Sequence, residues 1–164
     1  MHIAHVVGAR PNFMKIAPIM RALGCYPDVR QTLIHTGQHY DDALSGRLFE
    51  DLEIPAPDLN LGIGSEGRAS QLGRMIVALA EALEPLRPDW VVTVGDVNST
   101  LAAALTASGS GLRLAHVEAG LRSGDWTMPA ENSKTHCGRV SCRAWRTSSA
   151  GQTLSSGGGC CAHC

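Results

Sequence analysis

The amino-acid sequence predicts an α/β protein with a doubly wound parallel sheet. Short apolar segments rich in β-branched residues alternate along the chain with longer segments whose apolar residues recur at helical spacing. The first short segment, His2 to Val7, ends at a glycine, and a helical segment follows directly. This alternation is typical of parallel sheets, because two parallel strands must be joined by a crossover connection. The 164 residues are enough for one domain with a substantial core.

Composition excludes several classes of function. The formal net charge of -1 provides no electrostatic attraction for nucleic acid or for an anionic membrane. No apolar stretch is long enough to span a bilayer. The first apolar run has no basic region before it and is broken by Arg10 and Pro11, so it does not resemble a signal peptide. We therefore expect a cytoplasmic protein that binds neither nucleic acid nor membrane.

The first half of the chain predicts three strands and two helices. The strands are expected at His2–Val7, Val29–His35 and Asp58–Leu61. The first helix follows Pro11, ends at Gly24 and should be kinked by Pro18. Its expected apolar face consists of Met14, Ile16, Ile19, Met20 and Leu23. A second helix is expected at Asp41–Glu50.

The second half continues the same alternation. A long helix is expected over Glu66–Leu86, closed by Pro85 and Pro88. The apolar face of this helix consists of Leu72, Met75, Ile76, Leu79 and Leu83. Trp90–Val94 predicts a buried strand, followed by an Ala- and Leu-rich helix. The residues expected to cap that helix are Asn98, Ser99 or Thr100. The apolar run Leu112–Ala115 predicts one more buried strand, which leads into the stretch HVEAGLRSGD.

Polar residues follow each main strand of this predicted sheet. Because loops after parallel strands emerge at the same edge, we expect these residues to converge there. The residues in question are Arg10, Lys15, Gln38, His39, Asp96, Glu118 and Arg122. The strand–glycine–helix sequence around Arg10 suits phosphate binding at a helix N-terminus, or is a solvated helix start. Glu118 can equally cap a helix and pair with Arg122. Gln38 and His39 can face a ligand or merely cap the helix Asp41–Glu50, and for His39 the second interpretation is favoured.

Several motifs together resemble the non-hydrolysing UDP-N-acetylglucosamine 2-epimerases, over roughly Met1 to Glu131. The matching stretches are GARPNFMKIAP, TGQH, GDVNST, HVEAGLRSGD and MPAE. The resemblance implies a Rossmann-like domain covering residues 1–131, the N-terminal half of a two-domain fold like that of B-type glycosyltransferases. It also implies interconversion of UDP-N-acetylglucosamine and UDP-N-acetylmannosamine by elimination and re-addition of UDP, without a nicotinamide or metal cofactor. Full-length relatives are expected to be homodimers that serve cell-surface polysaccharide synthesis.

The resemblance also implies roles for individual residues. The implied catalytic carboxylates are Asp96, Glu118 and Glu131. The implied substrate-binding residues are Arg10, Lys15, Gln38, His39 and Arg122. Where the family has two consecutive glutamates, of which the first is catalytic, this chain has Ala130 and Glu131. Glu131 can replace that first glutamate only through a one-residue shift, which changes the geometry of the site.

Residues 132–164 lose the family pattern and have no helical or strand period. The abrupt change favours an out-of-frame or truncated continuation, and we expect this tail to be disordered. The alternative is a metal site, although the ligand spacing does not match a zinc knuckle. Its possible ligands are Cys137, Cys142, Cys160, Cys161, His163 and Cys164. We expect the chain alone to be inactive or nearly so; alternatives are a non-catalytic UDP-sugar binding module, a hydrolysing epimerase or a B-type glycosyltransferase.

Overall fold

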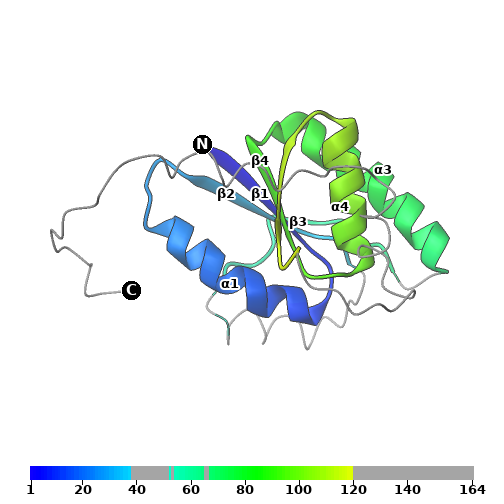
Figure 1. Cartoon of the computed structure of the whole chain (residues 1–164), viewed down its shortest axis with the longest axis horizontal. Coiled ribbons are helices and arrows are strands. Elements are labelled where there is room, and N and C mark those ends of the chain that lie inside the picture. The colour runs from blue at the N-terminus through cyan, green and yellow to red at the C-terminus, as the bar shows by residue number, and fades with distance from the viewer. Residues whose placement is uncertain (38–51, 53, 65–66, 120–164) are drawn as a thin grey trace, which may run out of the picture.

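The computed structural model describes residues 1–37, 52, 54–64 and 67–119. Within these ranges, five parallel strands form one sheet in the order β3-β2-β1-β4-β5 (Figure 1). The strands are β1 (His2–Val7), β2 (Arg30–His35), β3 (Leu59–Asn60), β4 (Trp90–Val94) and β5 (Arg113–Val117). The helices are α1 (Arg10–Gly24), α3 (Arg68–Leu86) and α4 (Asn98–Gly109). The chain begins at the centre of the sheet and extends it in both directions, so the predicted doubly wound architecture is confirmed.

Helices cover both faces of the sheet, with α1 on one face and α3 and α4 on the other (Figure 1). The pleat of β1 distributes its side chains between two cores, because successive residues of a strand point to opposite faces. Ile3 and Val7 belong to the core beneath α1, whereas Ala4 and Val6 belong to the core beneath α3 and α4. This two-sided burial explains why β1 carries apolar residues on both of its faces rather than on one.

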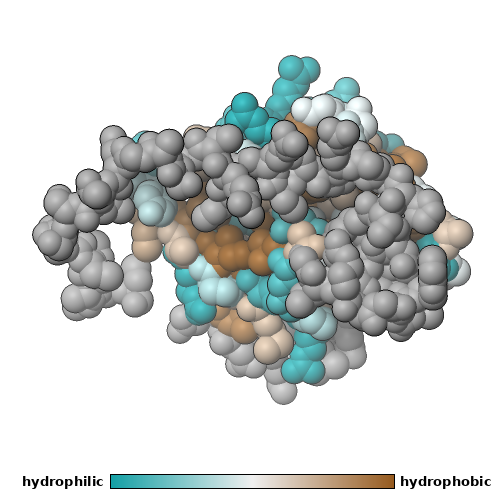
Figure 2. Space-filling model, viewed as in Figure 1, coloured by the Kyte–Doolittle hydropathy of each residue, from teal (hydrophilic) through white to brown (hydrophobic). Residues whose placement is uncertain are grey.

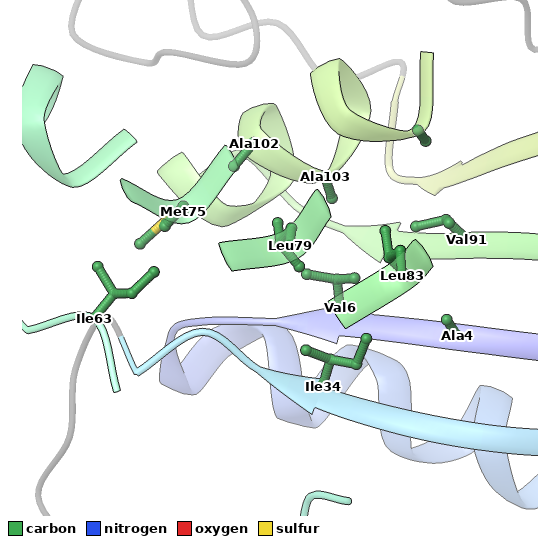
Figure 3. Packing of buried hydrophobic residues seen from close by; sticks show 11 residues of the cluster. Ala4, Val6, Ile34, Ile63, Met75, Leu79, Leu83, Val91, Ala102 and Ala103 are labelled. Atoms are coloured by element: carbon green, nitrogen blue, oxygen red, sulfur yellow. The ribbon is translucent and has the colours of Figure 1, made fainter. Parts of the chain in front are cut away.

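The core beneath α3 and α4 is built from large side chains of α3 and small ones of α4 (Figure 3). Met75, Leu79 and Leu83 lie on one face of α3 and are buried against the sheet, as predicted. Ala102 and Ala103 of α4 are fully buried beside them. Small alanines let the α4 backbone approach α3 closely, which explains the alanine-rich composition of that helix.

The first helix buries most of the predicted face, except that Phe13 and not Met14 lies in the core. Ile16 and Met20 are buried, and Ile19 and Leu23 pack partly buried against the same core. Phe13 and Ile16 are buried in the core beneath α1, whereas Met14 is 59% exposed. The buried residues are Asn12, Phe13, Ile16, Ala17 and Met20, a set with the expected i, i+3, i+4, i+7 spacing. Met14 lies about 100° around the helix from Phe13, and the larger aromatic ring takes the core position. Hydrophobic surface near α1 is visible in the space-filling view (Figure 2).

Each of the helices α1 and α3 contains one proline and continues through it. The helix α1 continues through Pro18, which lies on its exposed side together with Met14. Water can therefore hydrogen bond to the Met14 carbonyl that Pro18 leaves without its helical donor. The helix α3 ends at Leu86, as predicted, with Pro85 inside its last turn and Pro88 just beyond its end. Arg87 then takes a left-handed conformation with φ 40°, a common way to end a helix.

The start of α4 also differs from the prediction. Its N-cap is Val97, and no side chain caps the helix. Asn98 instead donates from Nδ2 to Gln71 Oε1 at 2.9 Å, and the Thr100 hydroxyl donates to the Val94 carbonyl at 3.0 Å. These side chains tie α4 to α3 and to the end of β4, so their polar groups are satisfied by tertiary partners rather than by their own helix.

The last strand is longer and less buried than predicted. It runs from Arg113 to Val117, so His116 and Val117 belong to the strand and not to the following loop. Leu114 to Val117 are half-buried, because β5 pairs with only β4 among the described residues. The predicted helix Asp41–Glu50, the start of the predicted helix at Glu66 and the tail 132–164 lie outside the described residues. Within the described part of the chain, no helix is long and apolar enough to cross a membrane.

Candidate functional site

The carboxyl ends of β1, β2, β4 and β5 lie together at one edge of the sheet. The Thr36 amide donates to the Val7 carbonyl at 2.9 Å, which joins the residue after β2 to the end of β1. The Gly95 amide donates to the Val117 carbonyl at 3.1 Å, which joins the turn after β4 to the end of β5. The described parts of the polar loops therefore converge at one edge, as the doubly wound topology requires.

Lys15 and Glu118 form an ion pair at this edge. Lys15 comes from the second turn of α1, whereas Glu118 directly follows β5, 103 positions later in the sequence. Their side chains are 36% and 34% exposed, so solvent reaches both groups. A pair of this exposure contributes only about 0–1 kcal/mol to stability. Its significance is the placement of a cation beside a carboxylate. The predicted alternative, a pair between Glu118 and Arg122, involves a residue outside the described part of the chain.

Glu118 has a left-handed backbone conformation with φ 66°, unusual for a residue with a side chain. On the neighbouring strand, Gly95 also has a positive φ, of 73°. The two residues directly follow Val94 and Val117, which are paired in the sheet. Each of these two adjacent strands is thus followed directly by a residue with a positive φ, and the two residues come after paired positions of the sheet. The conformation of Glu118 costs on the order of 1–2 kcal/mol, which the surrounding contacts must offset.

Gly95 is at the centre of this arrangement. Its amide donates to the Val117 carbonyl, and its own carbonyl accepts a hydrogen bond from His116 Nε2 at 2.7 Å. A Cβ atom at Gly95 would lie 3.6 Å from Lys15 Nζ and 3.5 Å from Asn12 Nδ2, which are ordinary contact distances. The positive φ, rather than lack of space, therefore favours glycine at this position.

Asn12 connects the first loop of the site to the end of β4. Its Oδ1 accepts a hydrogen bond from the Ala9 amide at 3.2 Å, and its Nδ2 donates to the Val94 carbonyl. The side chain is only 2% exposed. Sequence reasoning did not single out Asn12, although an Asn three residues after the N-cap of a helix is a recognisable capping position.

Gly8, at the end of β1, allows a close approach of three chain segments. A Cβ atom there would lie 2.5 Å from both Thr36 Oγ1 and Ser99 Oγ, far inside contact distance. Both hydroxyl oxygens are buried and have no hydrogen-bond partner within the described part of the chain. The glycine is therefore needed for packing beneath the site, independently of any ligand.

His35 supports the loop after β2. Its ring stacks on Phe13 with centroids 5.3 Å apart, and its Nδ1 accepts a hydrogen bond from the Gly37 amide at 3.1 Å. Burial lowers the pKa of the His35 imidazole, against a smaller opposing effect of a hydrogen bond with Asn60. His5, in the middle of β1, is also buried, and burial lowers its pKa against the effect of its hydrogen bond to Gln31. Both rings are thus kept neutral inside the fold.

Of the remaining predicted site residues, the structure describes two, Arg10 and Asp96. Arg10 is exposed at the first residue of α1, whose first turn contains no acidic residue. Asp96 is half-buried in the turn between β4 and α4. Four further predicted site residues lie outside the described residues: Gln38, His39, Arg122 and Glu131. The cysteines of the tail also lie outside, and the described residues contain no cluster of three or more metal-ligating side chains.

Comparison with known families gives a consistent result. A family model described as UDP-N-acetylglucosamine 2-epimerase matches residues 21–149. A UDP-N-acetylglucosamine 2-epimerase homolog of Methanococcus maripaludis is 43% identical over 141 residues, which cover 86% of this chain and 39% of the relative. A UDP-2,3-diacetamido-2,3-dideoxy-D-glucuronate 2-epimerase of Pseudomonas aeruginosa is 38% identical over 86% of this chain and 40% of the relative.

Solved structures agree with the sequence matches. The crystal structure of the Methanocaldococcus jannaschii UDP-GlcNAc 2-epimerase in complex with UDP-GlcNAc and UDP has a TM-score of 0.77 and 41% identity. The match covers 82% of this chain and 37% of that one. The Neisseria meningitidis enzyme bound to UDP-GlcNAc has a TM-score of 0.72 and 29% identity, over 79% of this chain and 36% of that one. The chain thus spans well under half the length of the relatives it matches.

Proposed function

Because the chain belongs to the UDP-N-acetylglucosamine 2-epimerase family, we propose that it supplies the N-terminal catalytic half of a sugar-nucleotide 2-epimerase. The proposed reaction interconverts UDP-N-acetylglucosamine and UDP-N-acetylmannosamine. The observation that carries the proposal is the Lys15–Glu118 pair at the carboxyl edge of the sheet, with Asp96 on the neighbouring loop.

The chemistry needs carboxylates and cations close together. A base removes the C2 proton while the C1–O bond to UDP breaks, and UDP leaves with the bonding electron pair. Re-addition of UDP to the resulting glycal, with a proton delivered to the opposite face of C2, gives the epimer. Positioned acids and bases accelerate such proton transfers. We assign this work to Glu118 and Asp96, and to Glu131 where the chain continues beyond the described residues.

Positive groups assist the departure of the diphosphate. Lys15 lies beside Glu118, and Arg10 is exposed at the N-terminus of α1. A cation and a helix N-terminus both stabilise developing negative charge. We propose that Arg10 and Lys15 meet the UDP part of the substrate, and that Gln38, His39 and Arg122 complete its binding.

Two chimeras test the proposal. In the first, residues 1–119 of this chain replace the corresponding segment of the M. jannaschii relative, and in the second residues 1–131 do so. We expect the first chimera to interconvert the two UDP-sugars and to introduce solvent deuterium at C2. The second carries Ala130 in place of the family's first glutamate and should be slower. A folded first chimera that binds UDP-GlcNAc but exchanges no C2 proton would contradict the proposal.

The 164-residue chain alone provides the complementary test. Because it spans under half the length of its relatives, we expect binding of UDP without turnover, measured by calorimetry and by NMR of the sugar C2 proton. Turnover at ordinary enzymic rates would contradict this expectation. The identity to the P. aeruginosa relative favours a second candidate substrate, UDP-2,3-diacetamido-2,3-dideoxy-D-glucuronate, which should be assayed in parallel.

A further inference from the structure

Two hydrogen bonds join the turn that carries Asp96 to the end of β5, directly before Glu118. Neither bond takes part in the proposed reaction itself. The Gly95 amide donates to the Val117 carbonyl at 3.1 Å. The Gly95 carbonyl accepts from His116 Nε2 at 2.7 Å. Gly95 is therefore held on both sides by β5, through the two residues that immediately precede Glu118.

We infer that His116 is a positioning residue, which holds the Gly95–Asp96 turn in fixed relation to Glu118. This inference rests on the proposed function, because it concerns the two carboxylates assigned to the reaction. Both turns are left-handed and follow paired residues of β4 and β5. The pairing of β4 with β5 ends at Val94 and Val117, so the side-chain hydrogen bond from His116 to the Gly95 carbonyl limits how far the following turn can move.

The hydrogen bond also fixes the state of the ring. A carbonyl oxygen only accepts, so His116 must carry its proton on Nε2 to donate. The Nε2–H donor is present both in that neutral tautomer and in the charged ring, so either form can make this hydrogen bond. A glutamine side chain also offers an N–H donor, whereas leucine has a similar volume and no donor. These two substitutions therefore separate the hydrogen bond from the packing of the side chain.

His2 provides a matched control at the opposite end of the sheet. Its ring hydrogen bonds to the Leu86 carbonyl at 3.2 Å and to Thr32 Oγ1 at 2.9 Å. Like His116, it is partly buried and joins a strand to a backbone carbonyl. Replacing it removes a comparable tether far from the carboxyl edge.

The first test uses the whole chain and needs no activity. In the ¹⁵N spectrum of the imidazole rings, we expect His116 to be protonated at Nε2, with slow exchange of that proton. In H116L the Gly95 amide should exchange about fivefold faster, the effect of losing roughly one hydrogen bond. In H116Q and in H2L its exchange should be unchanged. A His116 ring protonated only at Nδ1, or a Gly95 amide unaffected in H116L, would overturn the inference.

The second test places the same substitutions in the chimera that contains residues 1–119. We expect H116L to lower kcat for C2 proton exchange about 10- to 100-fold with KM within about threefold, because the acid–base groups are misplaced while substrate contacts remain. H116Q should retain most of the exchange rate of the unsubstituted chimera, and H2L should leave that rate unchanged. Equal loss in H116L and H2L would indicate a structural effect only and would overturn the inference. If the unsubstituted chimera is inactive while H116L still loosens Gly95, the proposed function fails and the tether stands.

Discussion

Residues with a positive φ occur at both ends of the parallel strands, which we call the amino and carboxyl edges of the sheet, but in different structural contexts. At the amino edge, Arg87 and Gly111 have φ 40° and 67° and lie where α3 and α4 end, just before the next strand. At the carboxyl edge, Gly95 and Glu118 take the same conformation directly after a strand. Ending a helix in this way is ordinary. Beginning a loop with a left-handed glutamate is not, and it coincides with the ion pair to Lys15.

The edges also differ in how their charged groups are used. At the amino edge, Asp89 accepts a hydrogen bond from the His2 amide at 2.7 Å, and the Arg113 guanidinium lies 5.7 Å from the Trp90 ring centroid. These contacts support the fold locally. At the carboxyl edge, a lysine and a glutamate from distant parts of the chain form an ion pair, and a half-buried aspartate follows the neighbouring strand. Each edge thus contains one charged residue in a left-handed conformation, and at the carboxyl edge that residue forms an ion pair with a distant part of the chain.

The largest expected effect comes from packing at the carboxyl edge. Gly8→Ala would place a methyl group 2.5 Å from the Thr36 and Ser99 hydroxyls, and we expect a loss of about 2–3 kcal/mol in the free energy of unfolding. Gly73→Ala in α3 is the matched control, since nothing lies within 4 Å of its Cβ position. That substitution should stabilise by about 0.5–1 kcal/mol. Urea unfolding measures the change in free energy for each variant. Equal changes in the two variants would contradict a special packing role for Gly8.

An intermediate effect is expected from the buried histidines. Because burial lowers the pKa of His5 and His35, the unfolded chain binds more protons than the folded one below about pH 6.5. Stability is therefore complete above that pH and is lost as the pH falls, by no more than about 1.4 kcal/mol per pH unit for each histidine.

Urea unfolding measured between pH 7 and pH 5 should show this slope. His35→Gln should reduce it, because one group that charges only on unfolding is removed. A slope unchanged in H35Q would mean that His35, at the carboxyl edge, is not kept neutral by the fold.

The smallest expected change in the free energy of unfolding comes from the most direct test of backbone strain. Glu118→Gly should relieve the left-handed conformation and stabilise the chain by about 0.5–1 kcal/mol, while it abolishes C2 proton exchange in the chimera. Arg87→Gly should stabilise by a similar amount and leave the exchange rate unchanged. If E118G destabilises the chain or retains the rate, the contrast between the two edges is wrong.

The sequence by itself determined the order of the elements and the edge at which the polar loops meet. Apolar runs such as Trp90–Val94 and the periodic leucines of α3 carry that information locally, since two-sided burial demands apolar residues. The motifs around Lys15, Asp96 and Glu118 determined the family, which the comparisons confirmed. The domain boundary at residue 131 and the roles of the individual site residues stay predictions.

Only the tertiary structure decided which residues meet. Periodicity could not choose between Met14 and Phe13 for the core, because that choice depends on the space beneath α1. It could not show that Asn98 and Thr100 bind other elements instead of capping α4, nor that Glu118 pairs with Lys15. The hydrogen bonds of Asn12 and His116 were not predicted for the same reason. Their hydrogen bonds join segments far apart in the chain, and no local pattern encodes a distant partner.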